Sequence, residues 1–453
     1  MCIHWQLFFI IAKVKGIQLM ELLSIQEYIN TNNVAYFLII GASLVIILSY
    51  LFSVVSQKTA IPSVILLIFL GFFSKKVFNI GVSDVDWIFS LEILGLVGLM
   101  LIVLEGALDL KLSKERWPMI WKSGLIAFLS LIINVFLFTY GIQILISNLD
   151  FLTAFIYAIP LSIISSAIVI PSVTQLEEEK REFLIYESTL SDIFGLILFY
   201  TVINNVHTSE VAKIGLNVVS NLGGTLILSV VLSYAMIIFF QRINSHVKLF
   251  LFISVLLLLY AIGKVFHLSS LLIILVFGLI LENRHIFFSG VMKKFLREEK
   301  VKEVLADFKL LTAESAFVVR TFFFFVFGLS ITIAGIFETR IVLGAFAFLA
   351  IIFLGRWLLF KIIVKKDFVP HVFIAPRGLI SVLLYFAIPD EFLINDFETG
   401  ILLFVILGSS IIMAWALVHY KLGKTGRLRK VVKLKTSISL KSIAKQKDIN
   451  TKA

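Results

Sequence analysis

Five ionisable side chains lie deep within long apolar stretches of the sequence: Glu105, Glu187, Asp192, Arg356 and Arg377. A charge inside a lipid-spanning segment is costly, so each of these residues is a candidate for ion transport or for a buried ion pair. Four further charged residues lie nearer the ends of such stretches, where we expect them at the membrane interface: Glu92, Asp109, Glu314 and Arg320.

The segment ESTLSD at residues 187–192 is the most informative of these stretches. Ser188 and Asp192 are four residues apart, so they share one face of a helix and can bind one small cation together. Ser191, backbone carbonyls and water could supply the other oxygen ligands that a hard cation prefers. A lone carboxylate there holds either a proton or a monovalent cation, which is enough for exchange. The alternative is that Asp192 only pairs with a neighbouring helix.

Glu187 lies about 140° around the helix from Asp192, so it faces a different neighbour. A buried glutamate needs a partner, and Arg356 lies well inside another apolar stretch. We expect a Glu187–Arg356 ion pair that holds helices together around the ion site. Loss of one partner would leave a buried charge at a cost of about 3–5 kcal/mol. Spacing does not exclude Arg377 as a competitor for the same acid.

Two apolar stretches contain residues that break helices. The first has Pro160 followed by SSAIVIP at 165–171, and the second has Pro376, Gly378 and Pro389 within IAPRGLISVLLYFAIP at 374–389. Freed carbonyls and half-helix ends at such breaks can line an ion site. The two stretches are seven spans apart, as an inverted repeat would place them. Two simply kinked helices would fit the composition equally well.

The composition requires a membrane to position these residues. The chain has 453 residues, is 60% hydrophobic with a mean hydropathy of +1.03, and is only 15% charged. A soluble chain carries about a quarter charged residues. About thirteen apolar spans lie between residues 34 and 418, and helices are expected because a lipid-exposed backbone must satisfy its own hydrogen bonds. The sequence thus predicts an all-α, multi-pass membrane protein with inverted repeats and two broken crossing helices.

The net charge of +11 is distributed as membrane orientation requires. Odd-numbered loops hold 19 Lys/Arg and even-numbered loops hold 5, which places the odd loops on the cytoplasmic side. We therefore expect a transmembrane domain at 34–418 in the cell (inner) membrane, an external N-terminal extension at 1–33 that starts at Met1 or Met20, and a basic cytoplasmic tail at 419–453. In the loop at 282–311 the spacing of Val301, Val304, Leu305 and Phe308 predicts an amphipathic helix on the inner leaflet.

Several motifs resemble the monovalent cation/proton antiporter superfamily, especially its sodium/proton exchanger branch. ESTLSD at 187–192 looks like that branch's E-S-x-x-N-D signature, and IVLEGALDL at 102–110 looks like its third-helix acidic motif. FFFFVFGLS at 322–330, GRWLLF at 355–360 and APRGLISVLL at 375–384 are similar to its late helices, in the same order. The resemblance covers residues 34–418, and the order of the motifs is more specific than any one of them.

This resemblance implies a core of six helices beside a dimerisation domain, hence a homodimer, with an elevator-like movement that alternates access. It makes Asp192 the cation/proton carboxylate, Ser188 a ligand, Glu105 an accessory acid and Glu187 the partner of Arg356. The residues assigned to the broken helices and their support are Ser165, Ser166, Arg377 and Gly378.

The chain departs from the family pattern at two places. Ser191 stands where the signature has asparagine, and Ser166-Ala167-Ile168 replaces the fifth-helix T-D-P, so one family acid is absent. These departures leave ion selectivity and the contacts at the helix crossing open. A single acid at this position resembles the electroneutral one-for-one exchangers.

The expected substrates are therefore Na⁺ or K⁺ and H⁺, in a lipid membrane, with no cofactor and no nucleic-acid partner. The main alternative is a passive or gated monovalent cation channel, which would use a ring of acids. A membrane-embedded enzyme is less favoured because the sequence contains no HExxH motif and no complete P-loop. Cys2 is the single cysteine, which excludes an intramolecular disulfide.

Overall fold

The computed structural model describes residues 34–59, 61–78, 86–206, 211–241, 248–265, 270–288, 298–331, 339–365, 368–394 and 400–420. The chain divides into two compact units, Met1–Leu51 and Phe52–Ala453. The site described below lies in the second unit. The predictions for residues 1–33 and 421–453 concern segments outside the described residues.

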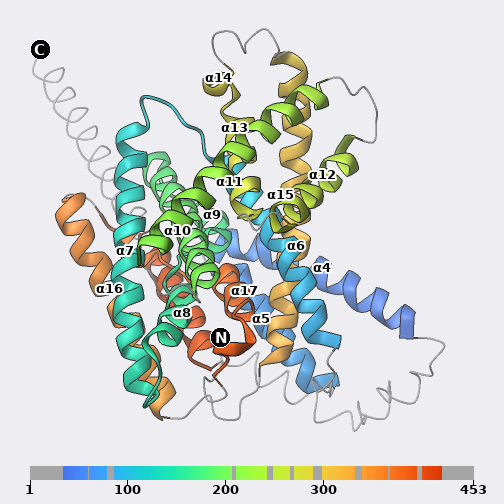
Figure 1. Cartoon of the computed structure of the whole chain (residues 1–453). Helices are drawn as coiled ribbons and strands as arrows, with labels where there is room; N and C mark the ends of the chain where they lie inside the picture. The colour runs from blue at the N-terminus through green and yellow to red at the C-terminus, as the bar shows by residue number, and fades with distance from the viewer. Residues whose placement is uncertain are drawn as a thin grey trace, which may run out of the picture. The chain divides into compact units, whose positions relative to one another are not determined.

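The described residues form helices and no strand (Figure 1). Their bounds are α4 Val34–Thr59, α5 Ser63–Phe78, α6 Asp86–Asp109, α7 Trp117–Leu145, α8 Phe151–Ser162, α9 Ser166–Ser172, α10 Glu178–Asn205, α11 Val211–Phe240, α12 Lys248–Val265, α13 Ser270–Glu282, α14 Arg284–Phe287, α15 Glu298–Ser330, α16 Thr339–Ile363, α17 Leu379–Phe386, two short 3₁₀ turns, η2 His371–Phe373 and η3 Asp390–Phe392, and a last helix Gly400–Tyr420.

The length and hydropathy of these helices fit a membrane protein. Within the described part, seven segments are long and apolar enough to cross a membrane, and three shorter apolar helices accompany them. One of the seven, Phe151–Ser172, comprises α8 and α9 together. The all-helical prediction is confirmed, whereas the count of thirteen spans stays a prediction.

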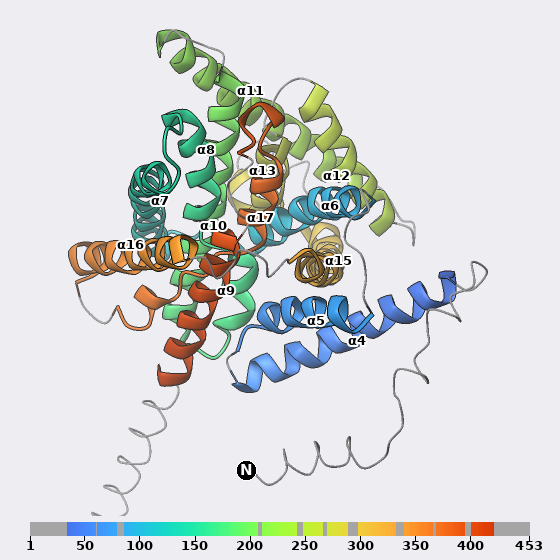
Figure 2. The same ribbon diagram turned by 90° about the horizontal axis from the view of Figure 1, so that it is seen from below.

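Two of the predicted spans are broken in their middle. The α8–α9 span is unwound at residues 163–165, where Ile163 and Ser165 adopt extended conformations. The second break lies between η2 and α17, at residues 374–378. The backbone N–H of Ser165 donates to the carbonyl of Pro376 at 2.9 Å, so the two unwound segments meet. In Figure 2, α9, α10 and α17 lie together near the middle of the second unit.

The helix α10 lies behind this crossing and packs against α7, α8 and α9. Asp150 is the N-cap of α8, and its carboxylate accepts from the N–H groups of Leu152 and Thr153 at 3.0 and 3.4 Å. Close packing fixes α10 against the break, because a Cβ at Gly195 would collide with the side chain of Ile163. The sequence thus holds the unwound segment directly beside the acids of α10.

The helix α15 corrects one expectation. Residues 298–330 form one continuous helix, and Val301, Leu305 and Phe308 are buried in the hydrophobic core. The predicted amphipathic helix on the inner leaflet is therefore wrong: its apolar face packs on the protein instead of on lipid. At the other end of α15, Gly328 crosses Gly71 of α5, and this crossing leaves no room for a side chain at either position.

Candidate cation and proton site

Three consecutive backbone N–H groups at the α8–α9 break donate to acceptors on two other parts of the chain, α10 and the unwound segment at residues 374–378. Ile164 donates to Oγ of Ser191 at 3.0 Å, and Ser165 donates to the carbonyl of Pro376. Ser166 donates to Oδ2 of Asp192 at 3.3 Å. A buried N–H group that loses its helical acceptor needs another one, so these three bonds offset the free-energy cost of unwinding the helix. They also bring Asp192 to the start of α9.

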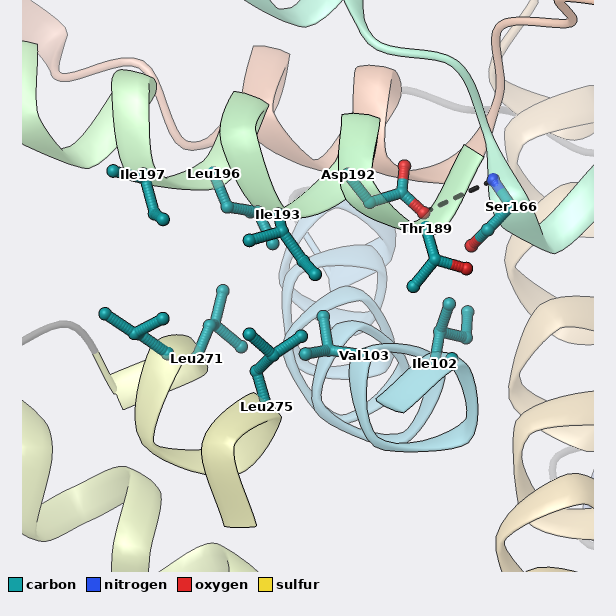
Figure 3. A pocket seen from close by; sticks show the side chains of 12 residues that line it. Ile102, Val103, Ser166, Thr189, Asp192, Ile193, Leu196, Ile197, Leu271 and Leu275 are labelled. Carbon is teal, nitrogen blue, oxygen red and sulfur yellow. Dashed lines mark hydrogen bonds between the residues drawn. The ribbon is translucent and has the colours of Figure 1, made fainter. Parts of the chain in front are cut away.

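The carboxylate of Asp192 is 5% exposed and lines a pocket between α6, α9, α10 and α13 (Figure 3). Its Oδ2 accepts from Ser166, whereas Oδ1 has no hydrogen-bond partner among the described residues. The hydroxyl oxygen of Thr189 is also buried without such a partner. Figure 3 draws the hydroxyl groups of Ser166 and Thr189 on the carboxylate's side of the pocket. The carboxylate of Asp192 and the hydroxyl groups of Thr189 and Ser166 therefore lie near one another at one end of the pocket.

The opposite wall of this pocket is apolar. Ile102 and Val103 come from α6, and Leu271 and Leu275 come from α13 (Figure 3). The pocket has room for a particle the size of a water molecule. An ion there would have oxygen ligands on one side and hydrocarbon on the other.

The structure places the hydroxyl groups of Ser188 and Ser191 elsewhere. Ser188 donates to the carbonyl of Ile185 at 3.2 Å, within its own helix. Ser191 accepts from the N–H of Ile164 and so supports the break. Both side chains are buried, and neither is among the residues that line the pocket of Asp192.

Glu187 and Arg356 meet directly. Nη1 of Arg356 donates to Oε1 of Glu187, and Nη2 donates to Oε2 at 3.2 Å. Both side chains are 1% exposed. The same guanidinium donates to the carbonyls of three residues around η2: His371 at 2.8 Å, Val372 at 3.0 Å and Ile374 at 3.2 Å. The pair thus links α10 and α16 to the first half of the second broken helix.

Arg377 supports the other broken helix instead of competing for Glu187. Its Nε donates to the carbonyl of Leu161 at 2.8 Å, near the end of α8, and its backbone N–H donates to Oγ of Ser409 at 2.9 Å. Gly378 is required at the crossing, because a Cβ there would lie 2.6 Å from Ile168 and 2.7 Å from Oγ of Ser165. Each broken helix therefore ends against a buried arginine.

Glu105 lies apart from the pocket of Asp192. Its Oε2 is 3.8 Å from Nη2 of Arg320, whose Nη1 donates to the carbonyl of Ala167 at 3.2 Å. Arg320, which was expected near the membrane interface, lies in the second half of α15 with a side chain that is 15% exposed. Arg320 joins α6 and α15 to the first turn of α9.

Sequence reasoning missed two residues of this region. Thr189 is three residues before Asp192, so helical spacing alone would have admitted it beside Ser188. Arg320 was expected at the membrane interface, so the sequence did not suggest it as a partner for Glu105. Of the residues assigned to the broken helices, Ser166 alone also lines the pocket.

The sequence and the fold are both similar to those of known proteins. A family described as "Sodium/hydrogen exchanger, transmembrane" matches residues 40–419. Two solved structures of the sodium proton antiporter MjNhaP1 from Methanocaldococcus jannaschii share the fold. The structure at pH 8 has a TM-score of 0.61 at 19% identity and covers 85% of this chain and 97% of that chain. The electron-microscopy structure has a TM-score of 0.62 at 20% identity, with 86% and 96% covered.

No curated protein matches the sequence. The family match extends over most of the chain, includes every residue placed in this site, and is that of a transporter. This chain belongs to the sodium/hydrogen exchanger family.

Proposed function

We propose that this protein exchanges Na⁺ or K⁺ for H⁺ by alternating access at one membrane-embedded carboxylate, Asp192. The observation that carries the proposal is the difference between the two carboxylate oxygens. Oδ2 is held by the N–H of Ser166, whereas Oδ1 is buried and has no partner among the described residues. One oxygen fixes the side chain, and the other is available to a proton or a cation.

Cation binding would use the carboxylate of Asp192 and the hydroxyl oxygen atoms beside it. Oδ1 of Asp192, the hydroxyl oxygens of Thr189 and Ser166, and water provide the hard ligands that an alkali cation prefers. Ser191 acts by holding the break open, through its bond to Ile164. Ser188 would become a ligand only after its hydroxyl group leaves the carbonyl of Ile185.

The apolar wall explains why the two ions would be exchanged and not merely released. An empty carboxylate is charged, and moving it past the side chains of α6 and α13 would be costly. A bound monovalent cation or a bound proton leaves the site neutral. Only the two neutral forms would therefore cross, with one cation for one proton, and transport would be electroneutral.

Alternating access requires the acid to meet water on each side in turn. We assign the movement to the elements that are tied together around the site, α8, α9, α10, α16 and α17, which would slide in an elevator-like manner against α6 and α13. Glu105 would act from α6, where it meets Arg320.

We further propose a homodimer in the cell membrane, with the N-terminus outside and the basic C-terminal tail in the cytoplasm. This orientation rests on the excess of Lys/Arg in odd-numbered loops.

Transport in proteoliposomes tests the proposal and separates it from a channel. An outward gradient of Na⁺ or K⁺ should drive proton uptake, reported by a pH-sensitive dye, with the membrane potential clamped at zero. A clamped potential of either sign should leave the initial rate unchanged. A channel would instead conduct the cation without moving protons at zero potential, and that result would refute exchange.

A further inference from the structure

A second, wide pocket lies at the ends of α6, α13 and α15, at the upper end of the molecule in Figure 1 near α14. It encloses about 1220 Å³ including its open mouth. Five cations line it: Lys111, Arg116, Arg284, Lys302 and Lys309. The charge distribution predicts that this end faces the cytoplasm.

Two of the five cations are neutralised by neighbouring acids. Nη1 of Arg116 lies 2.7 Å from Oε1 of Glu182, and Nζ of Lys309 lies 2.7 Å from Oε2 of Glu282. These pairs shape the pocket but contribute little to its net charge.

The other three cations, Lys111, Arg284 and Lys302, have no ion-pair partner among the described residues. The remaining acid in the lining is Glu115, which is fully exposed. Hydrogen bonds from its own backbone and from Ser113 lower the pKa of Glu115, so it stays ionised. A further acid, Asp109, lies beside the pocket and interacts electrostatically with Lys309 and Lys111. The three cations without an ion pair still outnumber the two acids Glu115 and Asp109, so the pocket keeps a positive charge.

The base of the pocket is preorganised by Asn283. Its Oδ1 accepts from the N–H of Leu112 at 2.6 Å, and its Nδ2 donates to the carbonyl of Leu110 at 2.8 Å. Because Asn283 is 1% exposed, these bonds hold the loop after α6 firmly against the end of α13. Beside it, Nε of Arg284 is buried and has no hydrogen-bond partner among the described residues. A buried N–H of a guanidinium needs an acceptor.

Large apolar side chains lie close to three of these cations in the sequence: Trp117 and Leu310 directly follow Arg116 and Lys309, and Ile286 is two residues after Arg284. Trp117, Ile286 and Leu310 are 60%, 45% and 62% exposed. Exposed aromatic and aliphatic side chains next to cations are typical of the boundary between lipid headgroups and hydrocarbon. The pocket therefore lies where a headgroup can enter it while the acyl chains remain in the bilayer.

We propose that this pocket binds the phosphate group of an anionic phospholipid, with Arg284, Lys302 and Lys111 as the donors. Phosphate oxygens satisfy a guanidinium and two ammonium groups at once. The bound lipid would link the loop after α6 to α13 and α15, and both α6 and α13 also wall the site of Asp192.

Lipid binding to the purified full-length protein tests this proposal. Titration with phosphatidylglycerol, with phosphatidylcholine as the neutral comparison, should raise the melting temperature only for the anionic lipid, and native mass spectrometry should retain it. Arg284→Gln combined with Lys302→Gln should weaken binding about thirtyfold, since each cation near the surface contributes roughly a factor of five.

The matched control removes two exposed cations that do not line the pocket, by Lys114→Gln combined with Lys361→Gln, and should retain the wild-type affinity. Equal weakening by both double variants would show that only diffuse charge matters and would overturn the site. Equal stabilisation by inorganic phosphate would overturn the assignment to a lipid. If the first double variant does not fold, the exposed pair Lys111→Gln and Lys302→Gln replaces it with the same criteria.

Discussion

At the scale of single residues, the hydroxyl groups of α10 show what spacing can and cannot predict. Ser188 was predicted as a ligand because it shares a helical face with Asp192, but Thr189 shares that face as well. In the structure only Thr189 lines the pocket, because Ser188 turns back to the carbonyl of Ile185. The choice depends on which neighbouring helix each side chain faces, and that information is not local.

Replacing Thr189 by valine should therefore weaken cation binding. Thr189→Val keeps the shape of the side chain but removes one oxygen ligand, which is worth about 1 kcal/mol, or about fivefold in the apparent KM for the cation. Ser188→Ala is the control and should leave KM near the wild-type value. Initial rates of cation-driven proton movement measure both, and the opposite ranking would restore Ser188 as the ligand.

The Glu187–Arg356 pair illustrates a tertiary contact that the sequence did anticipate. Few ionisable residues lie inside the apolar stretches, so few pairings were available to a buried acid. The structure brings these two residues together, but it adds the carbonyls around η2, which sequence reasoning had not placed near Arg356. The buried guanidinium therefore has more acceptors than its acid alone.

Glu187→Gln should lower the yield of folded protein more than it changes ion preference. It leaves the buried charge of Arg356 without its acid, at a cost of about 3–5 kcal/mol. Adding Arg356→Gln should restore part of the yield, although the carbonyls around η2 then lose donors. Fluorescence-detected size exclusion measures yield and dispersity. A stable single variant with altered cation affinity would assign Glu187 to the ion site instead.

At the scale of elements, both broken helices could be predicted, but their break points could not. Pro160 lies inside α8, and the helix unwinds three residues later, at 163–165. The unwinding occurs where Ser191, Pro376 and Asp192 offer acceptors to the freed N–H groups. Proline and glycine mark a helix that can break, whereas partners from other helices decide where it breaks.

The crossing of the two breaks should not tolerate a side chain at residue 378. Gly378→Ala would place a Cβ against Ile168 and Ser165, and overpacking of this kind costs about 1–3 kcal/mol. The melting temperature of the solubilised protein should fall accordingly. Gly223→Ala in α11 is the matched control, because a Cβ there meets nothing within 4 Å. Equal melting temperatures for the two variants would mean that the crossing is looser than described.

The helix α15 shows how an apolar pattern can mislead. The spacing of Val301, Leu305 and Phe308 fits an amphipathic helix on a lipid surface, but it fits a helix packed on protein equally well. Burial of all three residues distinguishes the two cases, and burial depends on α15 being continuous to Ser330. Charged residues in its first turns, such as Glu298 and Glu299, hid that continuity.

At the scale of the whole molecule, the fold class and the protein family could be predicted from the sequence, whereas the number of membrane spans could not be settled from it. Composition alone required a membrane, and the family match at residues 40–419 agrees with the order of the sequence motifs. Short apolar helices such as α13, with 13 residues, make the number of spans ambiguous, because a helix needs roughly 20 residues to cross a membrane.

Competition at a single site predicts how pH acts on the whole transporter. Protons and cations that share Asp192 exclude each other, so protonation lowers the fraction of sites open to the cation. As pH falls below the pKa of that carboxyl group, the apparent KM for the cation should rise about tenfold per pH unit, because each pH unit is a tenfold change in proton concentration. Rates measured over several pH values test this. A constant KM with a falling maximal rate would indicate a separate proton site.

The most direct test of the central claim is to measure cation/proton exchange by the Asp192→Asn variant in proteoliposomes. Asparagine has nearly the same shape and can still accept from the N–H of Ser166, but it can neither carry a proton at Oδ1 nor neutralise a cation. We predict that correctly folded Asp192→Asn protein shows no cation-driven proton movement with Na⁺, K⁺ or Li⁺, while Asp192→Glu retains part of it. Coupled exchange at the wild-type rate in Asp192→Asn would contradict the account.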